Sequence, residues 1–172
     1  MFLSEASTGA GGVFELIPLI VFIPVIGLLV NLLLGRRFGE RFVGITASTA
    51  SGLAFVIAVL QWVGLQGTHG EAVVVHFLVW ITIGDVSIPW EFRVDTLSVT
   101  MMLVVSGIGT LIHIYAAGYM RYDVRYKEAP VSYTRFFIYL ILFIAMMMIL
   151  VTGNSYLMLF VGWEGVGLSS FL

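Results

Sequence analysis

Five long apolar runs constrain the fold of this sequence more than any other feature. They cover residues 16–34, 42–65, 96–119, 133–151 and 156–172. About 20 apolar residues in a helix cross the roughly 30 Å hydrocarbon core of a bilayer. Helix is the expected state, because an open strand in lipid would leave its backbone groups without hydrogen bonds. The runs therefore predict an all-α integral membrane protein, with four transmembrane helices and a truncated fifth in a single membrane domain over residues 1–172.

The composition agrees with a membrane protein and excludes several functional classes. Of the 172 residues, 60% are apolar and 10% are charged, whereas soluble domains are about a quarter charged. The mean hydropathy is +1.06. A net charge of −2 without a basic cluster argues against nucleic acid as a partner. Because the sequence contains no cysteine, it has no disulfides, thiolate metal sites or cysteine-ligated iron–sulfur clusters.

The basic residues predict the orientation of the helices. Those between the first and second runs, and those between or beside the third and fourth, are Arg36, Arg37, Arg41, Arg121, Arg125, Lys127 and Arg135. Loops rich in Lys and Arg stay on the cytoplasmic side of a membrane. The remaining basic residue, Arg93, lies among acidic residues between the second and third runs. We therefore expect the N-terminus and that loop on the outer, periplasmic side.

Residues 72–95, between the second and third runs, show a different periodicity. From Val86 to Asp95 apolar and polar residues alternate, and residues 73–83 offer a second alternating apolar face. A period of two is typical of a half-buried strand. Gly84-Asp85 suits a tight hairpin turn. We expect an external β-hairpin that lies on the membrane domain and braces the helices or a neighbouring subunit.

Glu164 is the one charged residue deep inside an apolar run. It lies about eight residues after Tyr156, which places it roughly 12 Å into the membrane at 1.5 Å per residue. An ionised carboxylate at this depth costs roughly 2.5 to 3.5 kcal/mol. The carboxyl is therefore either protonated or ionised beside a basic partner, which would have to lie outside this chain. A carboxyl that switches between these states is a proton-binding site. The structural alternative is a permanently protonated Glu164 that donates to a backbone carbonyl.

Small residues surround Glu164. Gly162, Gly165 and Gly167 would let another helix approach closely, and Ser169 and Ser170 could form hydrogen bonds or hold water. These residues favour a helix interface around Glu164, although the glycines would serve packing equally well without any proton chemistry.

His113 is the second titratable group inside a run. It lies about 17 residues into the third run, roughly 25 Å across and close to the inner surface. A place in a proton path and an interfacial imidazole bonded to backbone or water remain equally open. His69 and His76 lie on the outer loop without a third ligand at metal-binding spacing, so we assign them no metal.

Several stretches resemble one known family. They are residues 92–102, the Leu111-Ile-His-Ile-Tyr stretch continuing to Met120, residues 133–137, and Gly162-Trp-Glu-Gly-Val-Gly-Leu168. Together they resemble the start of the distal antiporter-like subunits of respiratory complex I, called chain L in bacteria and subunit 5 in mitochondria. The Trp163-Glu164 pair is shared with sister subunits and with the large subunit of multisubunit sodium/proton antiporters. The Ile-His-Ile-Tyr and Gly-Val-Gly-Leu stretches favour chain L.

The resemblance implies a proton-translocating, non-redox subunit of an NADH:quinone oxidoreductase. Glu164 then matches the family's key glutamate on the fifth helix, which works with a lysine on a later helix. Because this sequence has no such helix, we expect an N-terminal fragment that is inactive alone. NADH, FMN, iron–sulfur clusters and quinone would belong to the rest of the complex, and this chain would hold no cofactor.

The resemblance also implies partners and a location. The partners would be the lipid bilayer and other membrane subunits of complex I, especially another antiporter-like subunit. The location would be the bacterial plasma membrane, or the mitochondrial inner membrane for an organellar chain. Two alternatives stay open: a component of a sodium/proton antiporter and a nonfunctional membrane fragment.

Overall fold

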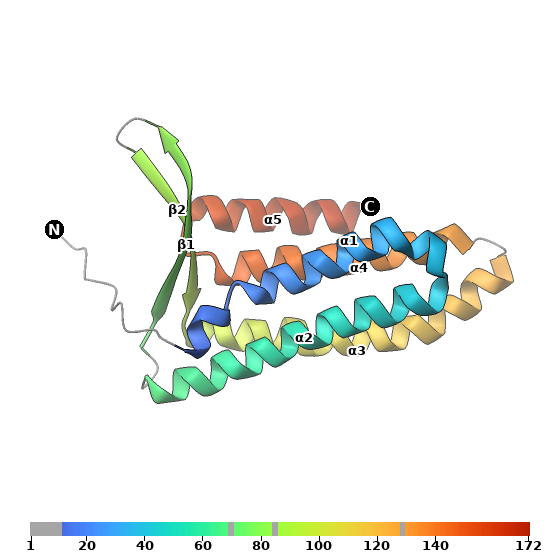
Figure 1. Cartoon of the computed structure of the whole chain (residues 1–172), viewed down its shortest axis with the longest axis horizontal. Helices are drawn as coiled ribbons and strands as arrows, with labels where there is room; N and C mark the ends of the chain where they lie inside the picture. The colour runs from blue at the N-terminus through green and yellow to red at the C-terminus, as the bar shows by residue number, and fades with distance from the viewer. Residues whose placement is uncertain (1–11, 69–70, 84–85, 128–129) are drawn as a thin grey trace.

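The protein is a bundle of membrane-length helices with a two-stranded hairpin at one end (Figure 1). The computed structural model describes residues 12–68, 71–83, 86–127 and 130–172. Its elements are the 3-10 turn η1 (Val13–Leu16), α1 (Leu19–Phe38), α2 (Glu40–Gly67), β1 (Val73–Ile83), β2 (Val86–Val94), α3 (Thr96–Lys127), α4 (Pro130–Thr152) and α5 (Tyr156–Phe171). The predicted fold class is confirmed.

Helices α1 to α4 each end beyond the apolar run that predicted them. Four segments are long and apolar enough to cross a membrane: Val13–Phe38, Glu40–Gly67, Thr96–Tyr122 and Tyr133–Thr152. The largest difference is in α3. Its apolar run ends at Tyr119, whereas the helix continues to Lys127. An apolar run marks the part of a helix that lipid can surround, whereas the helical hydrogen bonds can continue into water. The fifth helix, α5, has 16 residues.

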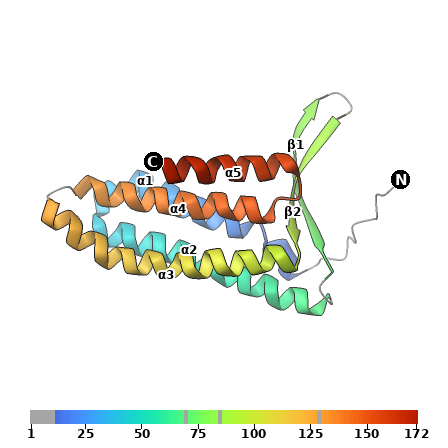
Figure 2. The same cartoon turned by 180° about the vertical axis from the view of Figure 1, so that it is seen from behind.

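The first four helices pack around one another, and α5 lies outside them. In the bundle, α2 packs between α1 and α3, and α4 contacts α1, α2 and α3 (Figures 1 and 2). Small residues allow these approaches: a Cβ added to Gly27 would lie 2.6 Å from the Cβ of Ala50. By contrast, α5 packs mainly against α4. One side of α5 is therefore left without a protein neighbour in the described chain.

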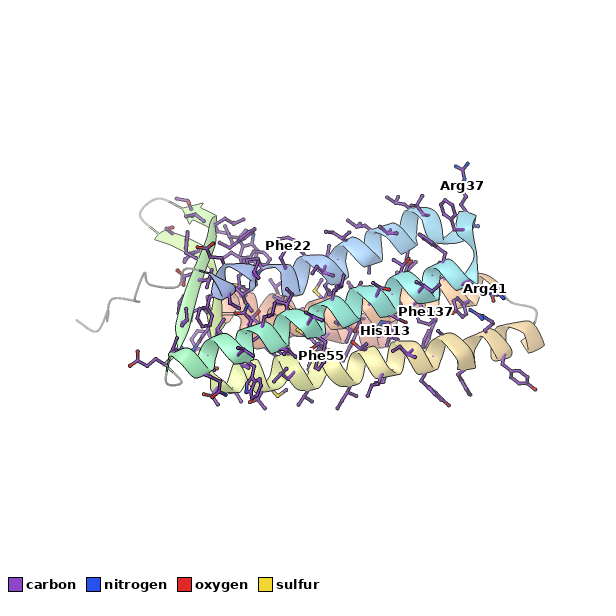
Figure 3. The ribbon with its side chains drawn as sticks, turned by 60° about the horizontal axis from the view of Figure 1, so that its bottom comes forward. Phe22, Arg37, Arg41, Phe55, His113 and Phe137 are labelled. Carbon is purple, nitrogen blue, oxygen red and sulfur yellow. The ribbon has the colours of Figure 1, made fainter. Side chains whose placement is uncertain are left out.

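The surface of the bundle is apolar along its length and charged at its ends. Large side chains such as Leu33, Ile45 and Leu111 are exposed, and only lipid or other protein could cover so continuous an apolar surface. Arg37 and Arg41 lie at the end opposite the hairpin (Figure 3). This distribution, together with the four membrane-length helices, makes the protein a multi-pass integral membrane protein.

The predicted hairpin forms, with β1 and β2 antiparallel. Near the helices the alternation holds, because Phe92 and Val94 are buried and Arg93 between them is exposed. Further along β1, bulges between His76 and Leu78 and between Val79 and Ile81 shift the register. There the predicted apolar face covers no core, and residues 77–80 are exposed. Figure 1 shows why: the hairpin crosses the helix ends and then projects beyond α5. The predicted Gly84-Asp85 turn lies outside the described residues.

Candidate functional site

Glu164 lies on the exposed side of α5. This helix begins after Ser155, whose hydroxyl accepts a hydrogen bond from the backbone N–H of Met158 at 3.3 Å. Its buried side consists of Met158, Gly162 and Ser169. Glu164 itself is exposed, as are the large apolar residues Leu157, Phe160, Leu168 and Phe171 of the same helix. The carboxylate therefore faces away from the bundle that α5 packs against.

Two of the three predicted glycines bring α5 close to α4. A Cβ on Gly162 would lie 2.5 Å from the backbone nitrogen of Leu150, and one on Gly165 would overlap the sulfur of Met146. Gly167 takes no part, because nothing in the described chain lies within 4 Å of a Cβ added there. It lies two residues after Gly165, about 200° further around a helix with 3.6 residues per turn, and so on the opposite side.

The Glu164 side chain lines a cavity of about 340 Å³ on the surface of α4 and α5. The other lining residues are Phe143, Trp163, Val166, Gly167 and Ser170. None of the described residues forms a hydrogen bond or an ion pair with the Glu164 carboxylate. The site can therefore take a proton or face a cationic group brought by another helix.

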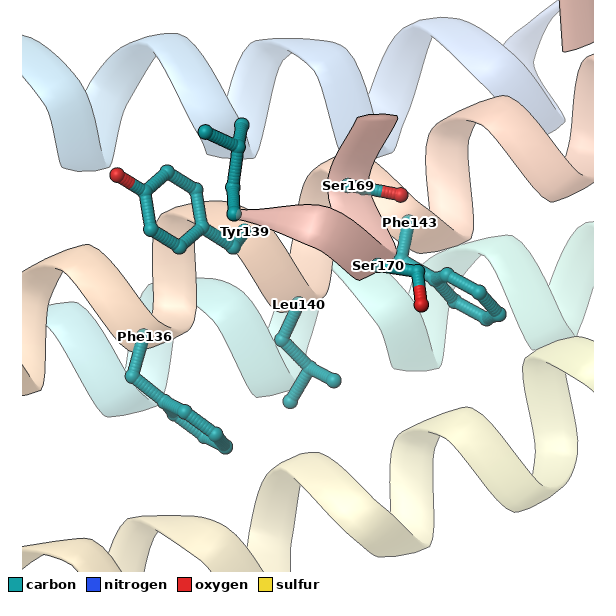
Figure 4. A pocket seen from close by; sticks show the side chains of 7 residues that line it. Phe136, Tyr139, Leu140, Phe143, Ser169 and Ser170 are labelled. Atoms are coloured by element: carbon teal, nitrogen blue, oxygen red, sulfur yellow. The ribbon is translucent and has the colours of Figure 1, made fainter. Parts of the chain in front are cut away.

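A neighbouring cavity of about 360 Å³ lies between α4 and the end of α5 (Figure 4). It is lined by Phe136, Tyr139, Leu140, Phe143, Ser169, Ser170 and Leu172. It shares Phe143 and Ser170 with the Glu164 cavity. The two serines differ: Ser169 is buried and donates to the carbonyl of Val166 at 2.9 Å, whereas Ser170 is exposed. Ser170 therefore contributes an exposed side chain to the lining of both cavities, next to Glu164 in one of them.

His113 is buried inside the bundle on α3, close to Phe137 of α4 (Figure 3). Its Nδ1 lies 2.7 Å from the carbonyl oxygen of Gly109, which can only accept, so Nδ1 carries the proton. The Nε2 atom is buried and has no hydrogen-bond partner in the described part of the chain. The imidazole is therefore bonded to the backbone and buried among the helices, and its place in a proton path stays a prediction.

Glu164 and His113 are not brought together. His113 lines a separate cavity of about 200 Å³ between α3 and α4. Both cavities are bordered by Phe143, whose ring is the one side chain they share.

Asn154, which was not among the predicted site residues, connects the hairpin to the start of α5. Its Nδ2 donates to Glu91 Oε2 at 2.8 Å, and its backbone N–H donates to the Glu91 carbonyl at 3.2 Å. Glu91 belongs to β2, and its other carboxylate oxygen lies 3.4 Å from Nδ1 of His76 on β1. A Gly-Asn-Ser stretch signals only a turn, and no sequence pattern relates residue 154 to residue 91.

No group of three or more His, Asp or Glu side chains within the described ranges could hold a metal ion. His76 pairs with Glu91. His69 lies outside the described residues. Nothing in the described ranges therefore forms a metal centre.

Comparison with known proteins places this chain beside one group of respiratory subunits. Residues 80–137 match the family described as NADH-Ubiquinone oxidoreductase (complex I), chain 5 N-terminus. The matched residues include His113 and end before Glu164. The resemblance predicted from the sequence is therefore confirmed for this region.

Individual relatives extend the similarity to most of the chain. It is 40% identical over 153 residues to NADH-ubiquinone oxidoreductase chain 5 of Cryphonectria parasitica, covering 89% of this chain and 22% of the relative. It is 37% identical over 158 residues to NADH-quinone oxidoreductase subunit L of Mycobacterium tuberculosis, covering 90% and 23%. For subunit L of Rhodobacter capsulatus the identity is 33%, covering 90% and 21%. The chain thus spans about a fifth of the length of the curated relatives it matches.

Proposed function

We propose that this chain forms the N-terminal part of a proton-translocating, antiporter-like membrane subunit of an NADH:quinone oxidoreductase. We propose further that Glu164 is its proton-binding carboxyl. The observation that carries the proposal is the position of Glu164, which lies midway along the apolar helix α5, lines a cavity and has no ionic partner among the described residues. The similarity to chain 5 and subunit L over about nine-tenths of the chain supports it.

The mechanism follows from the electrostatics of a carboxyl in lipid. An isolated ionised Glu164 would be unfavourable, so its proton occupancy depends on the distance to a cation carried by another helix. At an effective dielectric constant of about 20, a unit cation attracts a carboxylate by about 4 kcal/mol at 4 Å and about 1.7 kcal/mol at 10 Å. Withdrawal of the cation from 4 to 10 Å would thus raise the proton affinity of Glu164 about fiftyfold. Its return would release the proton.

In this proposal the chain itself carries no redox group. NADH, FMN, iron–sulfur clusters and quinone are bound in or beside other subunits. The redox reaction changes the proton occupancy of Glu164 because it moves charged groups relative to this carboxyl. The partners are other membrane subunits, especially another antiporter-like subunit, which would cover apolar surface such as Leu33 and Leu111.

We assign the hairpin end to the outer side of the membrane. Arg37 and Arg41 lie at the opposite end (Figure 3), where the excess of basic residues favours the cytoplasm. The membrane would be the bacterial plasma membrane, or the mitochondrial inner membrane, whose matrix side corresponds to the cytoplasm.

His113 has a secondary role in this proposal. Because Nδ1 donates to Gly109, the lone pair of the buried Nε2 is available for a proton. This geometry supports a place for His113 in a proton path that is separate from the Glu164 cavity.

The test is Glu164→Gln in the full-length subunit of the assembled complex. NADH oxidation by an artificial acceptor should be unchanged, because the redox groups lie elsewhere. Proton pumping, followed with a pH-sensitive dye in inverted vesicles, should fall at least about tenfold, since a carboxamide cannot carry the proton. His113→Gln in the same assay should give a smaller loss.

Glu71→Gln is the matched control, because Glu71 is exposed at the hairpin end of the protein. It should pump like the unmodified protein. Pumping at the normal rate in Glu164→Gln would contradict the proposed role of Glu164. Sodium-dependent proton exchange without NADH would favour the sodium/proton antiporter, although the names of the relatives favour the oxidoreductase subunit.

A further inference from the structure

A junction between the hairpin and α5 lies directly before the helix that carries Glu164. On β2, the Glu91 carboxylate uses both of its oxygens: Oε1 lies 3.4 Å from His76 Nδ1, and Oε2 accepts from Asn154 Nδ2 at 2.8 Å. Glu91 therefore connects both strands of the hairpin to the turn between α4 and α5.

Backbone contacts reinforce the same junction. The Asn154 N–H donates to the Glu91 carbonyl at 3.2 Å, and Phe92 forms a β-bridge with Gly153. The side chain of Phe92 is fully buried. A Cβ on Gly153 would lie 3.0 Å from the Cβ of Met158, so this turn also packs onto the first turn of α5. The turn at Gly153 and Asn154 therefore contacts both strand β2 and the first turn of α5.

The junction acts on Glu164 through the start of α5, the helix that carries it. In the described chain α5 packs mainly against α4, and its Glu164 side is exposed. Asn154 immediately precedes the N-cap, Ser155. About ten residues of helix, roughly 15 Å at 1.5 Å per residue, separate Asn154 from Glu164. A shift or rotation at the junction is therefore carried along the helix to the carboxyl.

We propose that Glu91 and Asn154 are positioning residues that set the depth and rotation of α5 and thereby place the Glu164 carboxyl. This inference rests on the proposed function of Glu164 as the proton-binding group. The hairpin then does more than brace the bundle, because a subunit that moves the hairpin also moves the proton site.

The hydrogen-bonding chemistry of the pair provides a sharp test. Asn154→Asp places two carboxylates against each other and breaks the bond. Glu91→Gln keeps it, because the amide oxygen still accepts from Asn154. In the double variant Asn154→Asp/Glu91→Gln the glutamine amide donates to the aspartate, so the bond re-forms with reversed polarity.

The measurement is the pH dependence of Glu164 labelling by a hydrophobic carbodiimide, in membranes that contain the full-length subunit in the assembled complex. A displacement of about 1 Å, from 4 to 5 Å from a cation, changes the proton affinity of a carboxyl about fourfold at an effective dielectric constant of 20. Asn154→Asp should shift the pH of half-maximal labelling by a comparable factor and lower the protons pumped per NADH. Glu91→Gln and the double variant should resemble the unmodified protein.

Three results would contradict the proposed positioning role of Glu91 and Asn154. They are an unshifted labelling profile in Asn154→Asp, the same shift in Glu91→Gln, or a double variant that stays as defective as Asn154→Asp. If Asn154→Asp does not accumulate, Asn154→Ala removes the donor without adding charge and should shift the profile in its place. Failure of the proposed function is seen separately: Glu164→Gln would pump normally, while the labelling of Glu164 would still respond to Asn154→Asp.

Discussion

Asp95 shows how one side chain determines where a helix begins. Its Oδ1 accepts a hydrogen bond from the backbone N–H of Ser98 at 2.7 Å, and its Oδ2 accepts from Arg93 Nε at 2.8 Å. Burial alone would raise the pKa of Asp95, but the hydrogen bonds from Ser98 and Arg93 outweigh it and hold the pKa below its ordinary value of 3.8. Asp95 is therefore an ionised N-cap of α3.

Substitution of Asp95 should separate its capping role from its charge. Asp95→Ala should destabilise the subunit by about 1 kcal/mol, the usual effect of losing an N-cap, whereas Asp95→Asn keeps a capping oxygen and should lose less. Because folding lowers the pKa, the ionised side chain stabilises the fold above about pH 4, and this contribution disappears as the pH falls through the unfolded and then the folded pKa.

Thermal unfolding of the purified subunit in detergent measures both effects. The difference between the unmodified protein and Asp95→Asn should be present at pH 7 and should shrink as the pH falls below the ordinary pKa of 3.8. Equal destabilisation by Ala and Asn at pH 7 would contradict the capping role.

At the scale of the helix, the packing of α5 on α4 depends on Gly162. A Cβ there would meet the backbone nitrogen and Cα of Leu150 at 2.5 and 2.7 Å, and backbone atoms cannot move aside as a flexible side chain can. Gly167 on the same helix has open space in the described chain. Gly162 thus faces the backbone of α4, whereas Gly167 faces no other part of the described chain.

Gly162→Ala should therefore push α5 away from α4, whereas Gly167→Ala should not. Overpacking of this kind typically destabilises by about 1 to 3 kcal/mol. We expect Gly162→Ala to lower both the amount of folded subunit in membranes and its thermal midpoint, with Gly167→Ala as the matched control. Equal behaviour of the two variants would show that the close contact with Leu150 does not govern helix packing.

At the scale of the whole molecule, the two ends of the bundle differ in charge. Phe38, beside Arg36 and Arg37, is exposed at the end opposite the hairpin, whereas Glu71 is exposed at the hairpin end. The proposed orientation places Phe38 on the inside and Glu71 on the outside of the membrane.

Cysteine labelling tests this orientation directly, since the chain has no cysteine of its own. In intact cells, Glu71→Cys should react with a membrane-impermeant maleimide, and Phe38→Cys should react only after the membrane is opened. Each variant is the control for the other. The reverse pattern of reactivity would show that the hairpin faces the cytoplasm.

Local sequence patterns were enough to predict the features that depend on how each segment partitions between lipid and water. Long apolar runs can be stable in a membrane only as helices, and alternation between Val86 and Asp95 matches a strand. Both features follow from local composition. Glu164 was found in the same way, because a single acid within an apolar helix needs no knowledge of distant residues to be recognised as unusual.

Which surfaces meet could be seen only in the folded molecule. It showed that Gly162 faces α4 and Gly167 does not, and that His113 is buried inside the bundle. It also showed that Asn154 bonds Glu91, a residue 63 positions earlier in the chain. Such contacts depend on the packing of complete elements against one another, so no local pattern encodes them. The junction between Glu91 and Asn154 is a result of that packing.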